Sequence, residues 1–324
     1  MPDLLTVSGL KVYYPVKGGV LLRSVAVCKA VDGVSFTLRQ GETLGIIGES
    51  GCGKTTLGKA IAGLAPITAG SVHFGDQSDQ PARRSGRDLA KMRQMIFQDP
   101  AESLNQRHPV SAIVAEPFEI HGIGTAAGRR QRAEELLRKV GLPAGSGDRY
   151  PFEFSGGQRQ RIGIARAIAL EPRLIICDEP VSALDVSVQS QVLNLMMDLQ
   201  RDMGLSYLFI SHNLAVVKHV SNRIGIMYLG KIVEMAPSEE IYRNPLHAYT
   251  RTLLSAIPVP DPAVRQTRIP VTGDVPSPIN PPPGCAFGAR TRHPRYSESI
   301  GMDLTLTEVS PGHFVQKCPC CTDL

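Results

Sequence analysis

The chain has 324 residues, enough for one large domain with a smaller appendage or for two modest domains. Hydrophobic residues make up 42% and charged residues 20%, the usage of an ordinary globular protein. No Trp, 5% aromatic residues and a net charge of only +5 argue against a dedicated nucleic-acid binder. We find neither a signal-peptide pattern nor an apolar run near the roughly 18 residues of a membrane span. We therefore expect a cytoplasmic protein whose partners supply any membrane spans.

The N-terminal third alternates short apolar runs with glycines. Residues 35–38 and 43–47 are predicted to be strands, and a glycine-rich loop leads from the second strand into a helix predicted over 54–64. The polar, basic stretch 76–95 is interpreted as a solvated loop and helix face. Residues 129–140 have the pattern of an amphipathic helix whose Arg and Lys side chains face water or a partner.

The middle of the chain continues this alternation. A Gly-Gly pair opens a helical stretch at 155–170, and the apolar run 173–179 is predicted to be a strand that ends in two acids. Residues 188–203 place apolar side chains on one helical face, Gly204 supplies a stop, and 206–212 is a further buried strand. Strands that alternate with helices predict an α/β fold with a mainly parallel sheet.

Residues 48–55, Gly-Glu-Ser-Gly-Cys-Gly-Lys-Thr, fit the phosphate-loop pattern GxxxxGK[ST] between a predicted strand and a predicted helix. Glycines let the backbone turn sharply, so that successive N–H groups point at phosphate oxygens, and the helix N-terminus adds positive charge there. Lys54 is expected to reach the β- and γ-phosphates, and Thr55 to offer its hydroxyl to Mg²⁺. The predicted nucleotide contacts are Gly48, Glu49, Ser50, Gly51, Cys52, Gly53, Lys54, Thr55 and Thr56.

Two adjacent carboxylates follow the predicted buried strand at 174–177. Ligands of such folds bind at the carboxyl edge of the sheet. Asp178 is therefore predicted to hold Mg²⁺, and Glu179 to act as general base or water-orienting group in ATP hydrolysis. Gln98 and His212 each follow another short apolar run, and taken singly either could be an ordinary loop residue.

The most discriminating motif is Phe-Ser-Gly-Gly-Gln at residues 154–158. It puts a Ser hydroxyl and Gly N–H groups at a helix N-terminus, which is a ready anion site. The motif is similar to the signature sequence of ABC ATPases, with Phe154 where that family usually has Leu. In the family the signature grips the γ-phosphate bound to the opposite subunit. The resemblance thus implies that a partner's nucleotide is contacted by Ser155, Gly156, Gly157 and Gln158.

The resemblance also implies roles for residues that are ambiguous alone. Gln98 matches the family's Q-loop glutamine, which senses Mg²⁺ and the membrane subunit, and His212 matches the switch histidine, which contacts the γ-phosphate. Residues 182–185 match the D-loop, which crosses the dimer interface. Tyr14, in preference to its neighbour Tyr13, is expected to stack on adenine.

Roughly residues 4–235 carry the resemblance, which implies an ABC-type P-loop ATPase fold. We expect a cassette at 1–236 with a RecA-like core, an antiparallel β subdomain and a helical subdomain at about 96–170. The remaining residues, 237–324, would form a C-terminal extension. High proline density at 258–283 predicts that part of it to be extended and turn-rich.

The C-terminal extension indicates which subfamily of ABC ATPases the chain resembles. Its stretches 244–251, 258–262 and 276–285 resemble the C-terminal extension of dipeptide, oligopeptide and nickel importer ATPases, which are bacterial and archaeal. That resemblance implies an ATP-hydrolysing importer subunit, for peptides or similar solutes, at the cytoplasmic face of the membrane. The implied partners are a second cassette, two transmembrane permease subunits and an extracytoplasmic solute-binding protein. The resemblance implies that the second cassette is a different chain, with two identical cassettes as the alternative. The solute itself stays open.

Two alternatives belong to other functional classes. A soluble ABC ATPase that acts on DNA or ribosomes usually carries paired cassettes or long coiled-coil inserts, and this chain shows neither. A regulatory module that holds ATP without turnover is the second alternative, and Glu179 argues against it.

Seven cysteines are present, and their spacing does not suggest a disulfide framework. Relatives of this extension often carry several cysteines, in some cases binding an iron–sulfur cluster; Cys285 and Cys318 match the outer positions, and Thr291 stands where a Cys is usual. Zn²⁺ or a cluster could bind here, but the adjacent pair Cys320-Cys321 is awkward for a compact site. We therefore expect free thiols on a loose tail.

Overall fold

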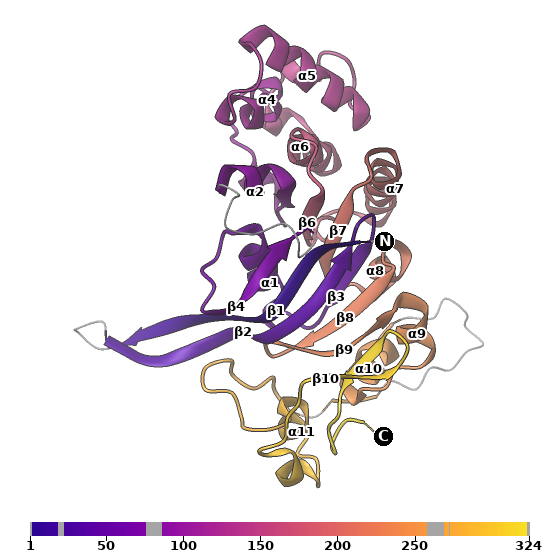
Figure 1. Ribbon diagram of the computed structural model, residues 1–324. Coiled ribbons are helices and arrows are strands. Elements are labelled where there is room, and N and C mark those ends of the chain that lie inside the picture. The colour runs from indigo at the N-terminus through magenta and orange to yellow at the C-terminus, as the bar shows by residue number, and fades with distance from the viewer. Residues whose placement is uncertain (1, 19–22, 76–85, 258–268, 272, 323–324) are drawn as a thin grey trace. The chain divides into compact units, whose positions relative to one another are not determined.

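The computed structural model describes residues 2–18, 23–75, 86–257, 269–271 and 273–322 (Figure 1). These residues belong to two compact units. The first is Met1–Leu4, Leu38–Thr43 and Phe74–Ile210, and the second is Leu5–Thr37, Leu44–His73 and Ser211–Leu324.

Three parallel strands form the sheet of the first unit: β5 (Arg93–Ile96), β6 (Leu174–Asp178) and β7 (Ser206–Ser211). β6 lies in the middle, with Met95 opposite Ile176 on one side and Cys177 opposite Phe209 on the other. All residues of β6 and β7 are buried, which explains why these segments are continuous apolar runs and do not alternate.

Helices follow each strand of this unit, and α4, α5 and α6 gather into one group (Figure 1). Leu137 of α5 and Ile162 of α6 are fully buried in it, so the amphipathic pattern of α5 is explained by packing. The helical elements are α2 (Gly86–Met92), α3 (Pro100–Ser103), α4 (Val110–Ile120), α5 (Ala126–Lys139), η2 (Ser146–Asp148), η3 (Pro151–Glu153), α6 (Gly156–Ile168) and α7 (Val186–Met203).

The second unit contains a mixed sheet in which β3 (Thr43–Ile47) is parallel to β8 (Arg223–Tyr228). β9 (Lys231–Pro237) pairs antiparallel with β8, β11 (His313–Gln316) with β9, and β10 (Leu306–Ser310) with β11. The last two strands come from the C-terminal extension. The extension is therefore built onto the edge of this sheet and is not only a tail.

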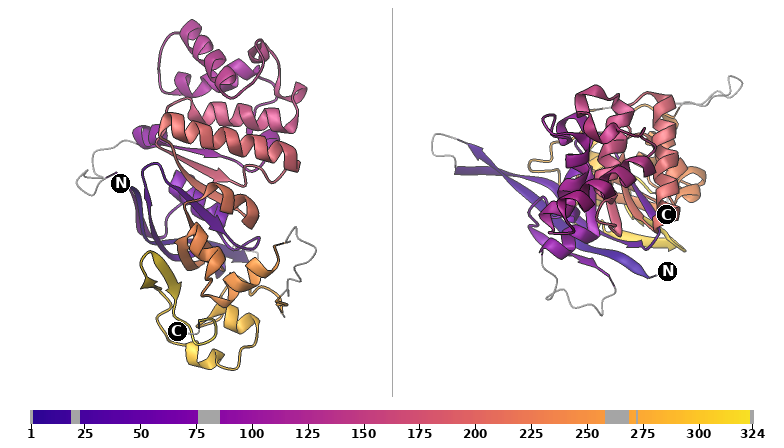
Figure 2. Two further views of the ribbon diagram at one scale, coloured as in Figure 1. Left: turned by 90° about the vertical axis from the view of Figure 1, so that its right-hand side faces the viewer. Right: turned by 90° about the horizontal axis from the view of Figure 1, so that it is seen from above.

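A separate three-stranded sheet, in the order β2-β1-β4, also lies mostly in this unit. Its strands are β1 (Asp3–Gly18), β2 (Arg23–Arg39) and β4 (Ala69–Phe74), and the views in Figure 2 show β1 and β2 side by side as a long ribbon. The unit's helical elements are α1 (Lys54–Ala62), α8 (Leu214–Val220), α9 (Ser238–Arg243), α10 (Ala248–Ser255), α11 (Ala286–Arg290) and η4 (Tyr296–Ser299).

A buried carboxylate joins the extension to β9. Glu234 is fully buried, and its oxygens accept hydrogen bonds from the backbone N–H groups of Leu246, at 2.7 Å, and His247, at 3.0 Å. The imidazole Nε2 of His313, on β11, lies 2.7 Å from the same carboxylate. A buried charge is stable only with such a full set of partners, so Glu234 fixes where the extension meets the sheet.

The α/β class is confirmed, and so are the predicted helices and strands of the cassette, with ends that mostly differ by a few residues. The strand predicted at 35–38 is the end of β2, which begins at Arg23. Of the expected loop and helix face at 76–95, residues 76–85 lie outside the described residues and 93–95 belong to β5. The prediction for 258–283 is tested only in part, because 258–268 and 272 lie outside the described residues. Residues 273–285 are irregular, as predicted. The strands at 306–316 were not predicted. β10 is mostly exposed, and the buried side chains of β11 include His313 and Gln316, so neither strand shows an alternation of apolar and polar residues.

Candidate functional site

The phosphate loop connects β3 to α1, and its backbone conformation and close packing require glycine at two positions. Gly53 has a φ of 105°, a left-handed conformation that favours glycine. A Cβ at Gly53 would lie 2.0 Å from the Ala30 carbonyl oxygen, and one at Gly48 would lie 2.1 Å from the Met227 carbonyl oxygen. Neighbouring backbone thus excludes any side chain at either position, and the loop can bend tightly between β3 and α1.

Lys54 is the first residue of α1, and its side chain folds back over the loop. Its Nζ donates hydrogen bonds to the carbonyl oxygens of Gly48, at 2.8 Å, and Glu49, at 3.0 Å. The lysine is buried, and its ammonium is close to the loop backbone that would surround a phosphate. Burial raises the pKa of the Cys52 thiol, so this side chain fills space in the loop and is not a reactive thiolate.

Two residues of the extension contact Glu49, the second residue of this loop. Arg290 Nη1 donates to both carboxylate oxygens of Glu49, at 2.9 and 3.1 Å. The Glu49 backbone N–H donates to the hydroxyl oxygen of Tyr249 at 3.0 Å. We call Arg290 and Tyr249 the loop brace. Both are well anchored, because Tyr249 is fully buried against Tyr228 and Phe287, and Arg290 Nε donates to a backbone carbonyl.

The sequence interpretation missed the loop brace. Tyr249 lies within a stretch that identified the subfamily, but nothing local connects it with residue 49. Arg290 and Glu49 are separated by 241 residues. The Arg290 side chain is only 11% exposed, and a charged side chain is rarely so buried without a specific partner. This signal could not be used beforehand, because exposure is known only from the structure.

The acidic pair ends β6 in the first unit. Asp178 is buried, and the next residue, Glu179, has a positive φ of 48°, which is uncommon for a non-glycine residue. The turn is held by the Glu179 N–H, which donates to the Ile210 carbonyl at 2.9 Å, and by the Ser182 hydroxyl, which donates to the Glu179 carbonyl at 3.0 Å. Backbone held in a rare conformation at the end of a buried strand is typical of a functional position.

Gln98 is brought to this carboxylate. Its Nε2 donates to Glu179 Oε2 at 3.3 Å, although the two residues are 81 positions apart. Gln98 comes soon after β5 and Glu179 directly after β6, and these two strands are neighbours. The structure therefore places two of the predicted catalytic side chains together within the first unit.

The signature motif forms the start of α6. Ser155 Oγ accepts a hydrogen bond from the Gln158 N–H at 3.4 Å, and the Gln158 side-chain oxygen accepts one from the Ser155 N–H at 3.0 Å. This reciprocal pair is a capping box. A Cβ at Gly157 would lie 2.3 Å from a methyl group of Val188, so a glycine is required where α6 meets the start of α7.

His212 and Tyr14 are the predicted site residues that remain. His212 directly follows β7 and is exposed. Of the two adjacent tyrosines, Tyr13 donates its hydroxyl to Asp32, whereas Tyr14 is more exposed, as a residue that stacks on a ligand must be. The phosphate loop, Tyr14 and His212 belong to the second unit, and Gln98, the acidic pair and the signature to the first. Their mutual arrangement across the units stays a prediction.

The predicted Mg²⁺ ligands Thr55, Asp178 and Gln98 offer a hydroxyl, a carboxylate and an amide oxygen. These are the hard oxygen donors that Mg²⁺ prefers. The chemistry of the donor set therefore fits the ion.

The expectation that the C-terminal cysteines lie on a loose tail is wrong. Cys285, Cys318, Cys320 and Cys321 are all buried, and they lie in ordered structure of the second unit. The Sγ atoms of the first three lie within 4.8 Å of one another, so they could hold a metal ion. All seven cysteines are free thiols in the structure. Packing, not sequence spacing, brings this group together.

Among the described residues, no helix is both long and apolar enough to cross a membrane.

Comparisons with known proteins agree with this geometry. Residues 31–182 match the ABC transporter family, and residues 233–295 match the oligopeptide/dipeptide transporter C-terminal region. The oligopeptide transport ATP-binding protein AppF of Bacillus subtilis is 50% identical over 321 residues, covering 96% of each chain. The putative peptide import ATP-binding protein BOV_A0347 of Brucella ovis is 50% identical over 314 residues, again covering 96% of each chain.

Two solved structures share the fold of the cassette. The ATP-binding cassette MJ0796, as a dimer bound to ADP and Pi, matches with a TM-score of 0.62 at 25% identity, over 72% of this chain and 99% of that one. The cbiO1 protein of Clostridium perfringens matches with a TM-score of 0.63 at 22% identity, over 75% and 92%. The expected ABC-type P-loop ATPase fold is therefore confirmed. Together these matches show that the chain belongs to the ABC transporter family of ATPases, among the ATP-binding subunits of oligopeptide and peptide importers.

Proposed function

We propose that this chain hydrolyses ATP to drive peptide import, closing on a second cassette around the nucleotide and so moving two membrane-spanning partners. The contact between Gln98 and Glu179 carries the proposal, because it places an amide beside the carboxylate that is expected to activate water. Peptide as the solute is supported by the names of the relatives in Bacillus subtilis and Brucella ovis.

ATP is proposed to bind at the phosphate loop. The Lys54 ammonium would exchange the loop carbonyls of Gly48 and Glu49 for oxygens of the β- and γ-phosphates. The N-cap residue of α1, Gly53, makes no side-chain hydrogen bond to the helix, and the first amides of α1 are proposed to donate to phosphate oxygens as well. The exposed ring of Tyr14 is proposed to stack on the adenine.

The chemistry follows from the acidic pair. A water oxygen forms a bond to the γ-phosphorus while the bond from that phosphorus to the β–γ bridging oxygen breaks, and the water proton passes to Glu179. Gln98 orients the carboxylate or the water, and His212 contacts the γ-phosphate. Mg²⁺, held by Thr55, Asp178 and Gln98, would neutralise charge on the phosphates.

The second cassette completes the site. Ser155, Gly156, Gly157 and Gln158 of that cassette are proposed to face the γ-phosphate, and Ser155 and Gly156 are exposed at the start of α6 as this requires. ATP then shifts an equilibrium between open and closed cassettes, and loss of phosphate reopens them. The dimeric state of MJ0796 with ADP and Pi supports such a cycle by analogy.

The proposed assembly comprises this chain, a second and different cassette, two permease subunits and an extracytoplasmic solute-binding protein, at the cytoplasmic face of the membrane. Within the chain, residues 1–236 would form the cassette and 237–324 the extension. The names of the relatives favour this assignment over a soluble ABC ATPase that acts outside transport.

The test is purification of the tagged protein from detergent-solubilised membranes of its own host, with mass spectrometry of co-purifying proteins and peptide uptake by a deletion strain. We expect two multi-span proteins and a second cassette, and loss of uptake that the wild-type gene restores and a Glu179→Gln gene does not. Recovery in the soluble fraction with ribosomal or DNA-repair proteins would contradict transport but leave ATP hydrolysis intact.

A further inference from the structure

The second residue of the phosphate loop is Glu49, a carboxylate in a loop that is proposed to surround the phosphates of ATP. An uncompensated negative charge there would repel the nucleotide. The loop brace, Arg290 and Tyr249, comes from the C-terminal extension and contacts this residue. We propose that both are positioning residues for ATP: Arg290 cancels the charge of Glu49, and Tyr249 fixes its peptide. The inference rests on the proposed binding of ATP at the phosphate loop.

The structure holds Glu49 through three of its groups. Its carboxylate oxygens accept hydrogen bonds from Arg290 Nη1 at 2.9 and 3.1 Å, and its N–H donates to the Tyr249 hydroxyl oxygen at 3.0 Å. Its carbonyl oxygen accepts from Lys54 Nζ at 3.0 Å and from the Cys52 N–H at 3.3 Å. When Lys54 turns to the phosphates, as proposed, the loop brace would still hold Glu49. The loop would then keep its shape without the lysine.

The ion pair is the part of the loop brace that depends on charge. The Arg290 side chain is 11% exposed and that of Glu49 is 30% exposed, so water screens this pair less than a pair on the open surface. Residues 48–56 carry one acid and one base, Glu49 and Lys54, and their formal charges sum to zero. Arg290 brings the formal charge at the loop to +1, which favours an anion.

Tyr249 contributes an uncharged hydrogen bond. Its side chain is fully buried, and burial raises the pKa of its phenol, so the hydroxyl stays neutral. The peptide between Gly48 and Glu49 is therefore fixed from two directions. The Met227 carbonyl oxygen leaves no room for a Cβ at Gly48, and the Tyr249 hydroxyl accepts the Glu49 N–H. Both constraints are in place before a nucleotide arrives.

Both members of the loop brace are themselves anchored within the extension. Tyr249 of α10 packs on Phe287 of α11, with ring centroids 5.4 Å apart, and Arg290 is the last residue of α11. At the start of α11 the Cys285 N–H donates to Ser299 Oγ at 3.0 Å. Packing between the two helices therefore sets the place of the loop brace independently of the loop that it contacts.

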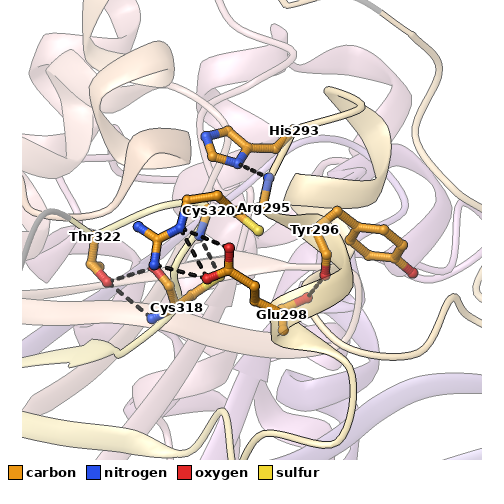
Figure 3. Close-up of polar contacts among 8 residues, drawn as sticks. His293, Arg295, Tyr296, Glu298, Cys318, Cys320 and Thr322 are labelled. Atoms are coloured by element: carbon orange, nitrogen blue, oxygen red, sulfur yellow. Dashed lines mark hydrogen bonds and ion pairs between the residues drawn. The ribbon is translucent and has the colours of Figure 1, made fainter.

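A second arginine of the extension, Arg295, provides a matched control. Its guanidinium pairs with Glu298 at 2.9 Å, beside Cys318 and Cys320 (Figure 3). Both side chains of this ion pair are more than half exposed, and such pairs contribute little. Replacing Arg295 therefore removes the same charge from the same part of the chain, outside the contacts that reach the phosphate loop.

The test measures the dissociation constant of a fluorescent ATP analogue for the full chain at low and high salt, with thermal unfolding of each variant alongside. Arg290→Gln should weaken binding about 3- to 10-fold at low salt, and less at high salt, because the Glu49 carboxylate is left uncompensated. Arg290→Lys keeps a positive charge, and one nitrogen of Arg290 makes both bonds to Glu49, so this variant should stay within about twofold of the wild type. Arg295→Gln should bind as the wild type does.

The double variant Glu49→Gln with Arg290→Gln separates charge cancellation from a merely structural ion pair. It should bind within about twofold of the wild type, because no charge is left to cancel. Wild-type affinity in Arg290→Gln, or a double variant as weak as Arg290→Gln, would overturn the role of Arg290.

Tyr249→Phe removes the hydroxyl and keeps the ring. It should weaken binding about 2- to 5-fold, equally at both salt concentrations, because the lost hydrogen bond carries no charge. Wild-type affinity in this variant would overturn the role of Tyr249. Failure of the wild type itself to bind the analogue has a different meaning: it would overturn the proposed nucleotide site, and this inference with it.

Discussion

The starts of α1 and α6 are both proposed to face a nucleotide phosphate, yet they are built in opposite ways. α1 follows Gly53, which has a left-handed conformation and supplies no side-chain cap. α6 follows Ser155, which shares a reciprocal capping box with Gln158. An uncapped start leaves its N–H groups available to an anion, whereas a capped start keeps its shape without one. The difference teaches that the start of α6 is held by its own side chains, whereas the start of α1 has no side-chain cap and depends on the conformation of the glycine loop before it.

Substitution Glu179→Gln should give the largest effect, because it removes the proton acceptor and spares both helix starts. We expect turnover to fall about 10²- to 10⁴-fold, with ATP binding retained and an ATP-bound dimer trapped on size exclusion. The control is Glu171→Gln, since Glu171 also has a positive φ but is exposed and outside the motifs. Unchanged turnover in Glu179→Gln would contradict its assignment as base.

Substitution Lys54→Ala acts on the start of α1 alone. Loss of the ammonium that neutralises phosphate charge should lower turnover about 100-fold or more and abolish binding of a fluorescent ATP analogue. Lys59→Ala, in the last turn of the same helix, should retain both properties. Normal ATP binding by Lys54→Ala would exclude the phosphate loop as the nucleotide site.

Substitution Ser155→Ala acts on the start of α6. Loss of the cap should lower the free energy of unfolding by about 1 kcal/mol, and loss of the hydroxyl facing the second cassette should lower turnover about tenfold. Thr125→Ala removes the equivalent cap of α5, where Thr125 Oγ1 accepts from the Gly128 N–H at 3.2 Å. That variant should cost similar stability without affecting turnover. Equal turnover in Ser155→Ala and Thr125→Ala would show that Ser155 only caps α6 and does not contribute to ATP hydrolysis.

Substitution Arg290→Ala tests whether the extension supports the start of α1. The ion pair with Glu49 is partly buried, so its loss should raise KM for ATP about 3- to 10-fold and change kcat less. Arg292→Ala is the control, because Arg292 is nearby in sequence and exposed.

A double-mutant cycle tests the ion pair directly. The effects of Glu49→Gln and Arg290→Gln on KM for ATP should not be additive, because either substitution alone removes the ion pair. Additive effects would exclude a direct coupling of the two side chains.

A third helix start, that of α10, should respond to pH and not to nucleotide. Its N-cap is His247, whose Nδ1 accepts a hydrogen bond from the Tyr249 N–H at 3.1 Å and can do so only when unprotonated. Burial lowers the pKa of His247 to about 4, whereas in the unfolded chain it is about 6.5. The neutral ring therefore contributes stability that is complete above about pH 6.5 and is lost as the pH falls toward 4.

Between about pH 6.5 and 4, the free energy of unfolding should fall by up to about 1.4 kcal/mol per pH unit because of His247. At neutral pH His247 should make the stability no more dependent on pH. Urea unfolding at several pH values should show the loss. His247→Asn keeps a capping side chain that does not titrate, so its stability should fall less steeply with acid. Identical slopes for the wild type and His247→Asn would exclude His247 as the titrating group.

The sequence alone determined the local architecture of this protein. The phosphate loop, the strand with two terminal acids and the capping box at residues 155–158 are all encoded by neighbouring residues, because backbone turns, helix starts and buried strands depend on short-range sterics and periodicity. Part of the cassette's helices and strands, such as β3, β6 and β7, could be predicted for the same reason. So could the family, since its signature motif is a local pattern.

Only the tertiary structure decided the contacts between distant parts of the chain. Arg290 reaches Glu49 across 241 residues, and Cys285 meets Cys318, Cys320 and Cys321 although spacing suggested loose thiols. β11 joins β9 through the buried Glu234 and His313, which no periodicity marks. Each of these contacts depends on chain closure over long loops and on burial that a linear pattern does not carry. For that reason the extension's likeness to a family was visible in the sequence, and its hold on the phosphate loop was not.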